Sequence, residues 1–298
     1  MHEVASLDER GGVRPRRRCA RKGSRVLVAL LSVVASVAAH AVPEVVITVA
    51  GKATTYTADA LLAHPAATTI TVPDDVAYKR AMTYRALPVA ALLTGVTGDD
   101  SVRFVASDGF AATLRAGPLL ATAEDGSRAY LAIEPAATPW PPLKAGSPAT
   151  AGTFYLVWLR PERAKIKPEQ WPYQIAKIED VAPIARRFPA LMPSATVSTS
   201  GPIRRGLEVF TTNCSVCHTL NLAGDAKMGP DLNVPYSPTE YLHDDALRRL
   251  IRDPQSLRHW PEAKMPAFDT KTIGARDLDD LIAYMRHMAR RKVPVTGK

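Results

Sequence analysis

Along residues 44–180, short apolar runs are broken repeatedly by polar residues, glycine and proline. Residues 101–114 alternate apolar with small or polar side chains, which is the pattern of half-buried strands. The dense apolar run at residues 153–159 predicts a buried central strand. Residues 56–65 and 87–96 have the apolar character of short helices. The pattern therefore predicts an α+β region that is mainly β.

The pattern changes to helical spacing after residue 202. Residues 203–212, 244–254 and 274–292 each place apolar side chains on one face of a helix. The last of these segments ends in basic residues, which suit a helix C-terminus. We expect an all-α domain over residues 203–298.

Residues 183–202 separate the two regions. They contain four prolines, a Ser/Thr run and a glycine, a composition that favours an extended and semi-stiff chain. The sequence therefore predicts two domains, residues 42–182 and 203–298, joined by this linker.

The first 41 residues have the features of a secretory signal peptide. Seven basic residues lie between positions 14 and 25, and about fourteen apolar or small residues follow, from Val26 to Ala39. Ala39-His40-Ala41 is an A-x-A cleavage pattern. We expect cleavage after residue 41 and a periplasmic mature protein. The alternative is an uncleaved leader that anchors the protein to a membrane.

The positive charge of the chain is concentrated in this leader. Residues 1–41 hold eight of the 38 Lys and Arg residues and three of the 29 Asp and Glu residues, so the formal charge falls from +9 to +4 without them. The remaining charge gives no indication of nucleic-acid binding. We expect no nucleic-acid partner, and contact with a membrane only if the leader stays attached.

Two of the three cysteines lie in one pentapeptide, Cys214-Ser215-Val216-Cys217-His218. The third, Cys19, belongs to the predicted leader, so the mature chain has too few cysteines for a disulfide framework. C-x-x-C-H is the attachment signal for c-type haem. Two thiols three residues apart reach both vinyl groups of one porphyrin, and the histidine that follows lies under the iron.

A zinc site and a redox dithiol are the alternatives for this motif. Zinc requires four ligands, and the remaining histidines of the mature chain, His64, His243, His259 and His287, form no closely spaced pair. A redox dithiol is expected in a thioredoxin-like βαβ context, which the pattern lacks. We therefore predict one covalently bound haem c.

Residues 203–292 resemble the class I cytochrome c family. Two matching residues, Gly206 and Phe210, precede the haem motif, and two others, Leu281 and Tyr284, lie in the last predicted helix. The segments Gly229–Leu232 and Lys264–Pro266, between the motif and that helix, also match. The resemblance implies that the first and last helices of the domain cross at the glycine.

The resemblance also implies the ligands of the iron. His218 and Met265 would bind it on opposite faces, and the carbonyl of Pro230 would accept a hydrogen bond from the imidazole of His218. Iron held in this way is six-coordinate, and methionine ligation raises its potential relative to two histidines. Such a site suits an electron carrier, because it leaves no position for oxygen or substrate. Met228 is a rival sixth ligand.

Other side chains near the predicted site have alternative roles. His243 and His259 would give a centre with two histidine ligands; we expect instead a helix-surface residue and a loop residue. Trp260 is expected to pack near the haem or to fill the core. Met285 and Met288 lie on the apolar stripe of the last predicted helix and are expected in the core.

Residues 44–180 resemble the molybdopterin-binding domain of the sulfite oxidase family. The shared features are a helix before an apolar segment at residues 87–93, a strand with Ser107-Asp108-Gly109-Phe110, and a late strand leading to the W-x-x-x-I-x-x-I-E pattern at residues 171–179. That family holds molybdenum through a cysteine thiolate, and this region contains no cysteine. We therefore expect the fold without its metal chemistry, no molybdopterin, and a role in docking.

Taken together, the two regions predict a periplasmic monohaem c-type cytochrome that exchanges single electrons with a redox protein. The partner would be a periplasmic dehydrogenase, an oxidase or another cytochrome. The chain has the features of an electron carrier, or of a subunit of an oxidoreductase, more than those of an enzyme. The alternative is a molybdopterin-dependent oxidoreductase, similar to sulfite dehydrogenase, with a fused haem as electron acceptor.

Overall fold

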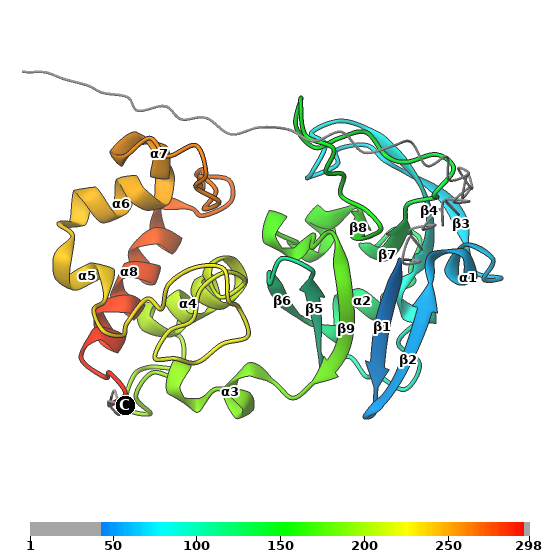
Figure 1. Ribbon diagram of the computed structural model, residues 1–298. Coiled ribbons are helices and arrows are strands. Elements are labelled where there is room, and N and C mark those ends of the chain that lie inside the picture. The colour runs from blue at the N-terminus through cyan, green and yellow to red at the C-terminus, as the bar shows by residue number, and fades with distance from the viewer. Residues whose placement is uncertain (1–42, 295–298) are drawn as a thin grey trace, which may run out of the picture. The chain divides into compact units, whose positions relative to one another are not determined.

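A computed structural model describes residues 43–294 of the chain (Figure 1). The predicted signal peptide, residues 1–41, lies outside the described residues. Within residues 43–294, no helix combines the length and the apolar character needed to cross a membrane.

The N-terminal region is built from two β-sheets (Figure 1). One sheet has five strands in the order β2-β1-β9-β5-β6, and the other has four in the order β3-β4-β7-β8. The strands are β1 (Glu44–Val49), β2 (Lys52–Thr57), β3 (Thr68–Val72), β4 (Met82–Pro88), β5 (Ser101–Ala106), β6 (Ala111–Arg115), β7 (Arg128–Ile133), β8 (Phe154–Leu159) and β9 (Ile175–Val181). Short helices connect them: α1 (Ala58–Leu62), η1 (Val89–Ala91), α2 (Ala116–Leu120), η2 (Pro161–Ala164) and η3 (Pro168–Gln170).

Local sequence explains the hairpin between β1 and β2 in the five-stranded sheet. β1 and β2 are antiparallel, with Val49 opposite Lys52, and the turn residues Ala50 and Gly51 both have positive φ angles. Two-residue hairpin turns need such angles, which glycine adopts without steric cost. β9 returns from the other end of the region to pair with β1 in parallel and with β5 in antiparallel orientation.

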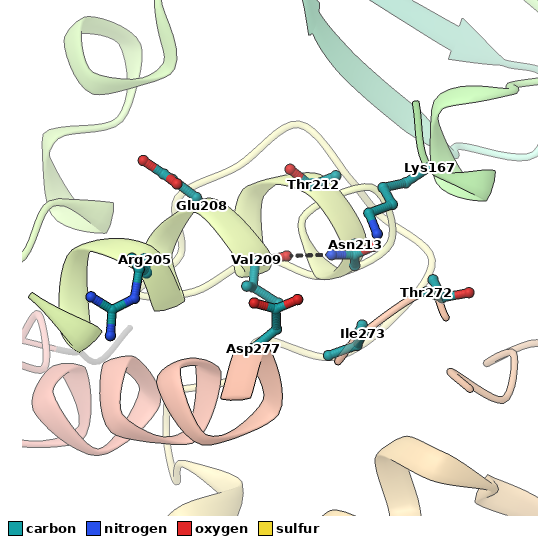
Figure 2. A pocket seen from close by; sticks show the side chains of 9 residues that line it. All are labelled: Lys167, Arg205, Glu208, Val209, Thr212, Asn213, Thr272, Ile273 and Asp277. Carbon is teal, nitrogen blue, oxygen red and sulfur yellow. Dashed lines mark hydrogen bonds between the residues drawn. The ribbon is translucent and has the colours of Figure 1, made fainter. Parts of the chain in front are cut away.

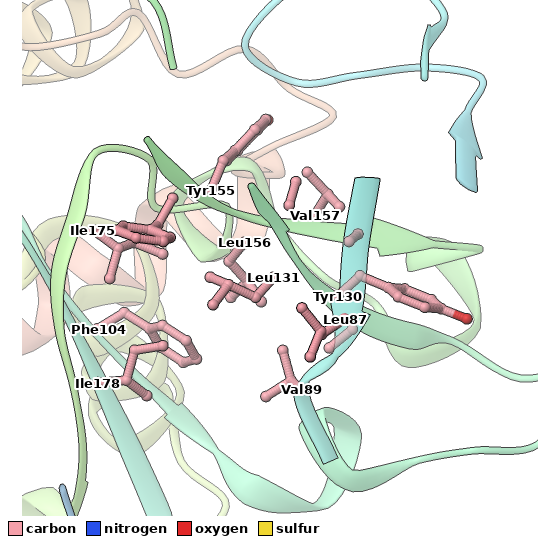
Figure 3. Packing of buried hydrophobic residues seen from close by; sticks show 14 of the residues in the cluster. Leu87, Val89, Phe104, Tyr130, Leu131, Tyr155, Leu156, Val157, Ile175 and Ile178 are labelled. Atoms are coloured by element: carbon pink, nitrogen blue, oxygen red, sulfur yellow. The ribbon is translucent and has the colours of Figure 1, made fainter. Parts of the chain in front are cut away.

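The core of this region lies where the two sheets meet (Figure 3). Phe104 and Ile178 contribute from the five-stranded sheet, and Leu87, Leu131 and Leu156 from the four-stranded sheet. All five side chains are completely buried. Alternating burial along β5 confirms the half-buried strand that the sequence predicts there.

Two sequence predictions for this region are wrong in detail. β8 is almost entirely buried, as predicted, but it lies at the end of its sheet and not at the centre. Its outer side is covered by the following chain, where the N–H of Leu156 donates to the carbonyl of Pro172 at 2.9 Å. The helix predicted at residues 87–96 is reduced to the single turn η1, because pairing with β7 extends β4 as far as Pro88.

The linker differs from the extended conformation that its prolines predict. It forms the short helices α3 (Ile184–Arg187) and η4 (Pro189–Leu191). Leu191 is completely buried, and its carbonyl accepts a hydrogen bond from the hydroxyl of Tyr284 at 2.8 Å. The N–H of Ser194 donates to Nε2 of His287 at 3.0 Å. Burial lowers the pKa of His287, which favours the neutral imidazole that accepts this bond. The linker is therefore packed against the C-terminal region.

The C-terminal region is helical, as predicted. Its elements are α4 (Pro202–Val209), the π-helical turn η5 (Phe210–Cys214), α5 (Pro238–Tyr241), α6 (Asp244–Arg252), α7 (Pro254–Leu257) and α8 (Ala275–Ala289). Leu278, Leu281, Ile282, Met285 and Met288 of α8 are all buried, which confirms the apolar stripe and the core role of its two methionines.

Helices α4 and α8 pack closely at Gly206, as the resemblance implied. A Cβ atom at this position would lie 2.6 Å from the carbonyl carbon of Asp280 and 2.7 Å from Cβ of Tyr284. The rings of Phe210 and Tyr284 pack beside this contact, with centroids 5.5 Å apart. Arg205 also pairs with the buried Asp280 at 2.6 Å. Only glycine permits so close an approach of the two helices.

Candidate haem-binding site

The Cys214–His218 pentapeptide forms a compact turn at the end of η5. The N–H of Cys217 donates to the carbonyl of Cys214 at 3.1 Å, and the N–H of His218 donates to the same carbonyl at 2.9 Å. Both thiols and the imidazole therefore belong to one turn of chain. This is the arrangement that the spacing of the motif predicts.

The imidazole of His218 is held in place by the segment that follows the turn. Its Nδ1 lies 2.8 Å from the carbonyl oxygen of Pro230. A carbonyl oxygen only accepts hydrogen bonds, so Nδ1 carries the proton and Nε2 is left with the lone pair that binds a metal. The N–H of Gly229 fixes this segment by donating to the carbonyl of Cys217 at 2.7 Å. The structure thus brings together Cys214, Cys217, His218 and Pro230, as expected.

Gly229 packs directly against this imidazole. A Cβ atom there would lie 2.5 Å from Nδ1 of His218 and 3.0 Å from Nε2. We predict that Gly229→Ala pushes the ring away from Pro230 and destabilises the domain by about 1–3 kcal/mol, the usual cost of overpacking. Chemical unfolding followed by the haem absorption band measures this.

Pro230→Ala is the matched control for this variant, because it keeps the backbone carbonyl that accepts the hydrogen bond. Its unfolding midpoint and its spectrum should stay close to those of the wild type. Equal effects of Gly229→Ala and Pro230→Ala would contradict a role for the space beside the ring.

Met228 lies close to Cys217 and to the segment that holds His218. Its Sδ is 3.9 Å from Sγ of Cys217, and the residue after it, Gly229, packs against the imidazole. A sixth ligand has to approach iron from the face opposite His218. The position of Met228 is therefore unfavourable for that role.

Met265 lies in a loop before α8, half-buried against the core of the C-terminal region. The other candidates near this loop are more exposed. His259 is exposed, and His243 directly precedes α6. Trp260 is 57% exposed and stacks with Arg258 at 5.6 Å from its ring centroid. The expectation that Trp260 fills the core is not met, because its side chain is largely exposed.

The two thiols are protonated at neutral pH. Burial raises the pKa of Cys214 to about 12 and that of Cys217 to about 11. Reactive dithiols and thiolate ligands of metals have lowered pKa values instead. Within residues 43–294, no three His, Cys, Asp or Glu side chains are grouped so that they would hold a metal ion. These properties do not favour the redox-dithiol and zinc interpretations.

The residues present fit a covalently attached haem. The free thiols, one packed against each hydrophobic core, are the groups that would add to the two vinyl side chains. Gly229 has no side chain, so it leaves room for the imidazole of His218. The hydrogen bond to the carbonyl of Pro230 orients this ring. Hydrogen-bonded partners of this kind fix the tautomer and the basicity of a metal ligand.

The β-sheet region contacts this site directly, and residues 43–294 belong to one compact unit. The N–H of Ala111 donates to the carbonyl of Val216, inside the haem motif, at 3.1 Å. Arg103 of β5 and Arg187 of α3 both pair with Asp225, in the loop after the motif. Sequence analysis missed these contacts, because isolated charges far apart in the chain form no local pattern.

A polar cavity of about 190 Å³ lies beside the same turn (Figure 2). Its lining residues come from α4 and η5, from the start of α8 and the loop before it, and from the β-sheet region: Lys167, Arg205, Glu208, Val209, Thr212, Asn213, Thr272, Ile273 and Asp277. Lys167 reaches across from the β-sheet region, and its Nζ donates to the carbonyl of Lys271 at 3.4 Å. The loop that carries Lys167 therefore reaches η5, the turn that ends at the first residue of the haem motif.

The β-sheet region does not fit a molybdenum cofactor of the sulfite oxidase type. Residues 43–182 contain no cysteine to supply the thiolate ligand. The basic side chains Lys79 and Arg80 are exposed in a turn, and Arg85 is exposed on β4. We therefore derive no chemical step through molybdopterin.

The fold and the site define a helical domain in which two cysteines and a histidine lie on one turn, as covalent attachment of haem requires. Residues 203–289 match the family described as Cytochrome c. The chain is 31% identical to a cytochrome c of Gibberella zeae over 103 residues, covering 29% of this chain and 93% of that protein. It is 30% identical to a cytochrome c2 of Agrobacterium tumefaciens over 108 residues, covering 31% and 96%. The chain therefore belongs to the cytochrome c family, and this domain binds haem c covalently and transfers electrons.

Proposed function

We propose that the protein carries single electrons between redox partners in the periplasm, through one haem c with His218 and Met265 as axial ligands. The observation that carries the ligand assignment is the hydrogen bond between Nδ1 of His218 and the carbonyl of Pro230. It leaves Nε2 as the metal-binding atom. Bound haem supplies an iron that gains and loses one electron.

The side chains of the protein determine how easily that electron moves. The hydrogen bond to Pro230 holds the imidazole of His218 in one orientation. A methionine thioether on the opposite face favours reduced iron and raises the potential. Met265 is preferred over Met228, because Met228 lies beside Cys217 and directly before Gly229, which packs against the imidazole of His218. With His218 and Met265 both bound to it, the iron would have no free position for a substrate.

Met265→Ala tests the assignment. We expect the variant to lose the methionine-to-iron absorption band and to have a lower midpoint potential. The decrease should be a substantial part of the range of about 0.8 V over which axial ligands set haem potentials. Spectroscopy and redox titration of the purified haem protein measure both quantities.

Met228→Ala is the matched control, since it removes the rival thioether. The methionine-to-iron absorption band should persist in Met228→Ala, and its midpoint potential should stay near that of the wild type. If the band survives in Met265→Ala and disappears in Met228→Ala, the ligand assignment is reversed.

The periplasmic location and the partner are part of this proposal. The basic and apolar leader of residues 1–41 supports export, and attachment of haem to a C-x-x-C-H motif suits an exported protein. The partner is a redox protein, such as a periplasmic dehydrogenase, an oxidase or another cytochrome.

We further infer that the β-sheet region serves as a docking module for the haem domain. Two arginines from outside the domain pair with Asp225, and the backbone of Ala111 bonds to Val216. These contacts support a fixed presentation of the haem domain to a partner. The absence of cysteine from residues 43–182 weighs against a substrate-oxidising molybdenum centre in this region.

A further inference from the structure

Glu169 belongs to the short helix η3, which lies beside the turn that leads into the haem motif. The turn is anchored on both sides. The indole N–H of Trp158, on β8, donates to the carbonyl of Gln170 at 2.9 Å. The N–H of Lys167 donates to Oε1 of the Gln170 side chain at 2.8 Å. The backbone that carries Glu169 is therefore held by the β-sheet region.

This turn packs against η5, the turn that ends at Cys214. Lys167, two residues before Glu169, lines the cavity beside Asn213 of η5 (Figure 2). The Oε2 atom of Glu169 is buried and has no hydrogen-bond partner among residues 43–294. A buried carboxylate oxygen without a partner is costly when it is charged, so the protonation state of this group is sensitive to any charge nearby.

The charges that face Glu169 come from several elements. Burial raises the pKa of Glu169, and Asp269 adds to that increase. Its own backbone N–H, Lys167 and Lys79 act in the opposite direction. The carboxylate in turn raises the pKa of both haem-binding thiols, Cys214 and Cys217. After haem attachment these sulfurs are thioethers and no longer titrate, so the haem joined to them becomes the variable charge near Glu169.

We propose that Glu169 is a proton-binding site coupled to the haem, one that takes up a proton when the haem is reduced and releases it when the haem is oxidised. This inference rests on the proposed function. Reduction brings one electron from the redox partner and removes one unit of positive charge from the neighbourhood of the carboxylate. The ionised form is then less stabilised, and the carboxylate binds one proton from solvent. Oxidation reverses both steps, so one electron and one proton move together.

The test is a redox titration of the wild-type haem protein over a range of pH. The midpoint potential of the haem should fall as pH rises through the range in which Glu169 titrates, called here the Glu169 window. This window should lie above the usual pKa of glutamate. The fall is expected because protonated Glu169 favours reduced haem and ionised Glu169 favours oxidised haem. Outside the Glu169 window, this group should not change the slope of midpoint potential against pH. In Glu169→Gln the slope in the window should be lost.

Two further variants make the test decisive. Lys79→Gln removes a positive charge that lowers the pKa of Glu169, so it should move the window to higher pH. Glu162→Gln removes an exposed glutamate of η2 and should leave the curve unchanged. If Glu169→Gln does not fold, the shift in Lys79→Gln decides the question.

Two outcomes would overturn the proposal. One is a Glu169→Gln protein with normal covalent haem and the same slope as the wild type. The other is a window that does not move in Lys79→Gln. Absence of covalent haem from the wild type would overturn the proposed function as well, so the two failures are distinguishable.

Discussion

A variant in which Cys214 and Cys217 are both replaced by alanine is expected to contain no covalently attached haem. Each thiol adds across one vinyl group of the porphyrin, and the other cysteine of the chain, Cys19, lies in the predicted leader. The imidazole of His218 would be left as the only link expected from this turn, and a single coordinate bond does not retain haem in denaturing solvent. Extraction with acidified acetone, followed by a pyridine haemochrome spectrum, measures the haem that remains on the chain.

The matched control for this variant is Ser215→Ala, in the same turn. Ser215 donates from its hydroxyl to the carbonyl of Thr211 at 2.8 Å, an interaction worth on the order of 1 kcal/mol. Its loss should leave the haem covalently bound. Haem that stays on the double cysteine variant after extraction would show that attachment occurs elsewhere.

Gly206→Ala is expected to be the most destabilising single substitution in the helical domain. The added Cβ atom would overlap the backbone of α8, whose Asp280 carbonyl group is fixed within the helix. The Asp280 side chain is also held by Arg205, so α8 does not shift away without breaking this ion pair. Overpacking of this kind costs about 1–3 kcal/mol or more, a large share of a total stability of about 5–15 kcal/mol.

Denaturant unfolding, followed by the haem band, measures the loss of stability in Gly206→Ala. Gly98→Ala serves as the control, because a Cβ atom there has its nearest neighbour at 3.6 Å, an ordinary contact. Its midpoint should change little. Equal midpoints for Gly206→Ala and the wild type would mean that the two helices separate without cost, contrary to the packing described here.

Both predictions concern the part of the protein that its relatives share. The feature that sets this chain apart is the β-sheet region, which contacts the haem motif through Ala111, the arginine pairs of Asp225, and the turn that carries Glu169. In this protein the surroundings of the haem motif are therefore built by two regions of the chain, and the second region supplies charges that the cytochrome domain itself lacks.

The sequence alone determined the chemistry of the haem site. The cysteines and the histidine of the motif lie within five residues, so covalent spacing places them on one turn whatever the rest of the fold is. Helices α4, α6 and α8 were equally predictable, because each has a continuous apolar face, whereas the single-turn helices α5 and α7 were not predicted. Strands β5 and β6 were predicted for the same reason, from local alternation of apolar and polar residues.

Tertiary structure decided everything that depends on pairing between distant segments. β8 is buried but lies at the end of its sheet, because the chain after it covers its outer side. Pairing with β7 extends β4 to Pro88, so the apolar segment at residues 87–96 keeps only one helical turn. The contacts of Asp225 and the burial of Glu169 join residues that are far apart in sequence. Local periodicity records how a side chain alternates between core and solvent, and it carries no information about which distant segment provides the core.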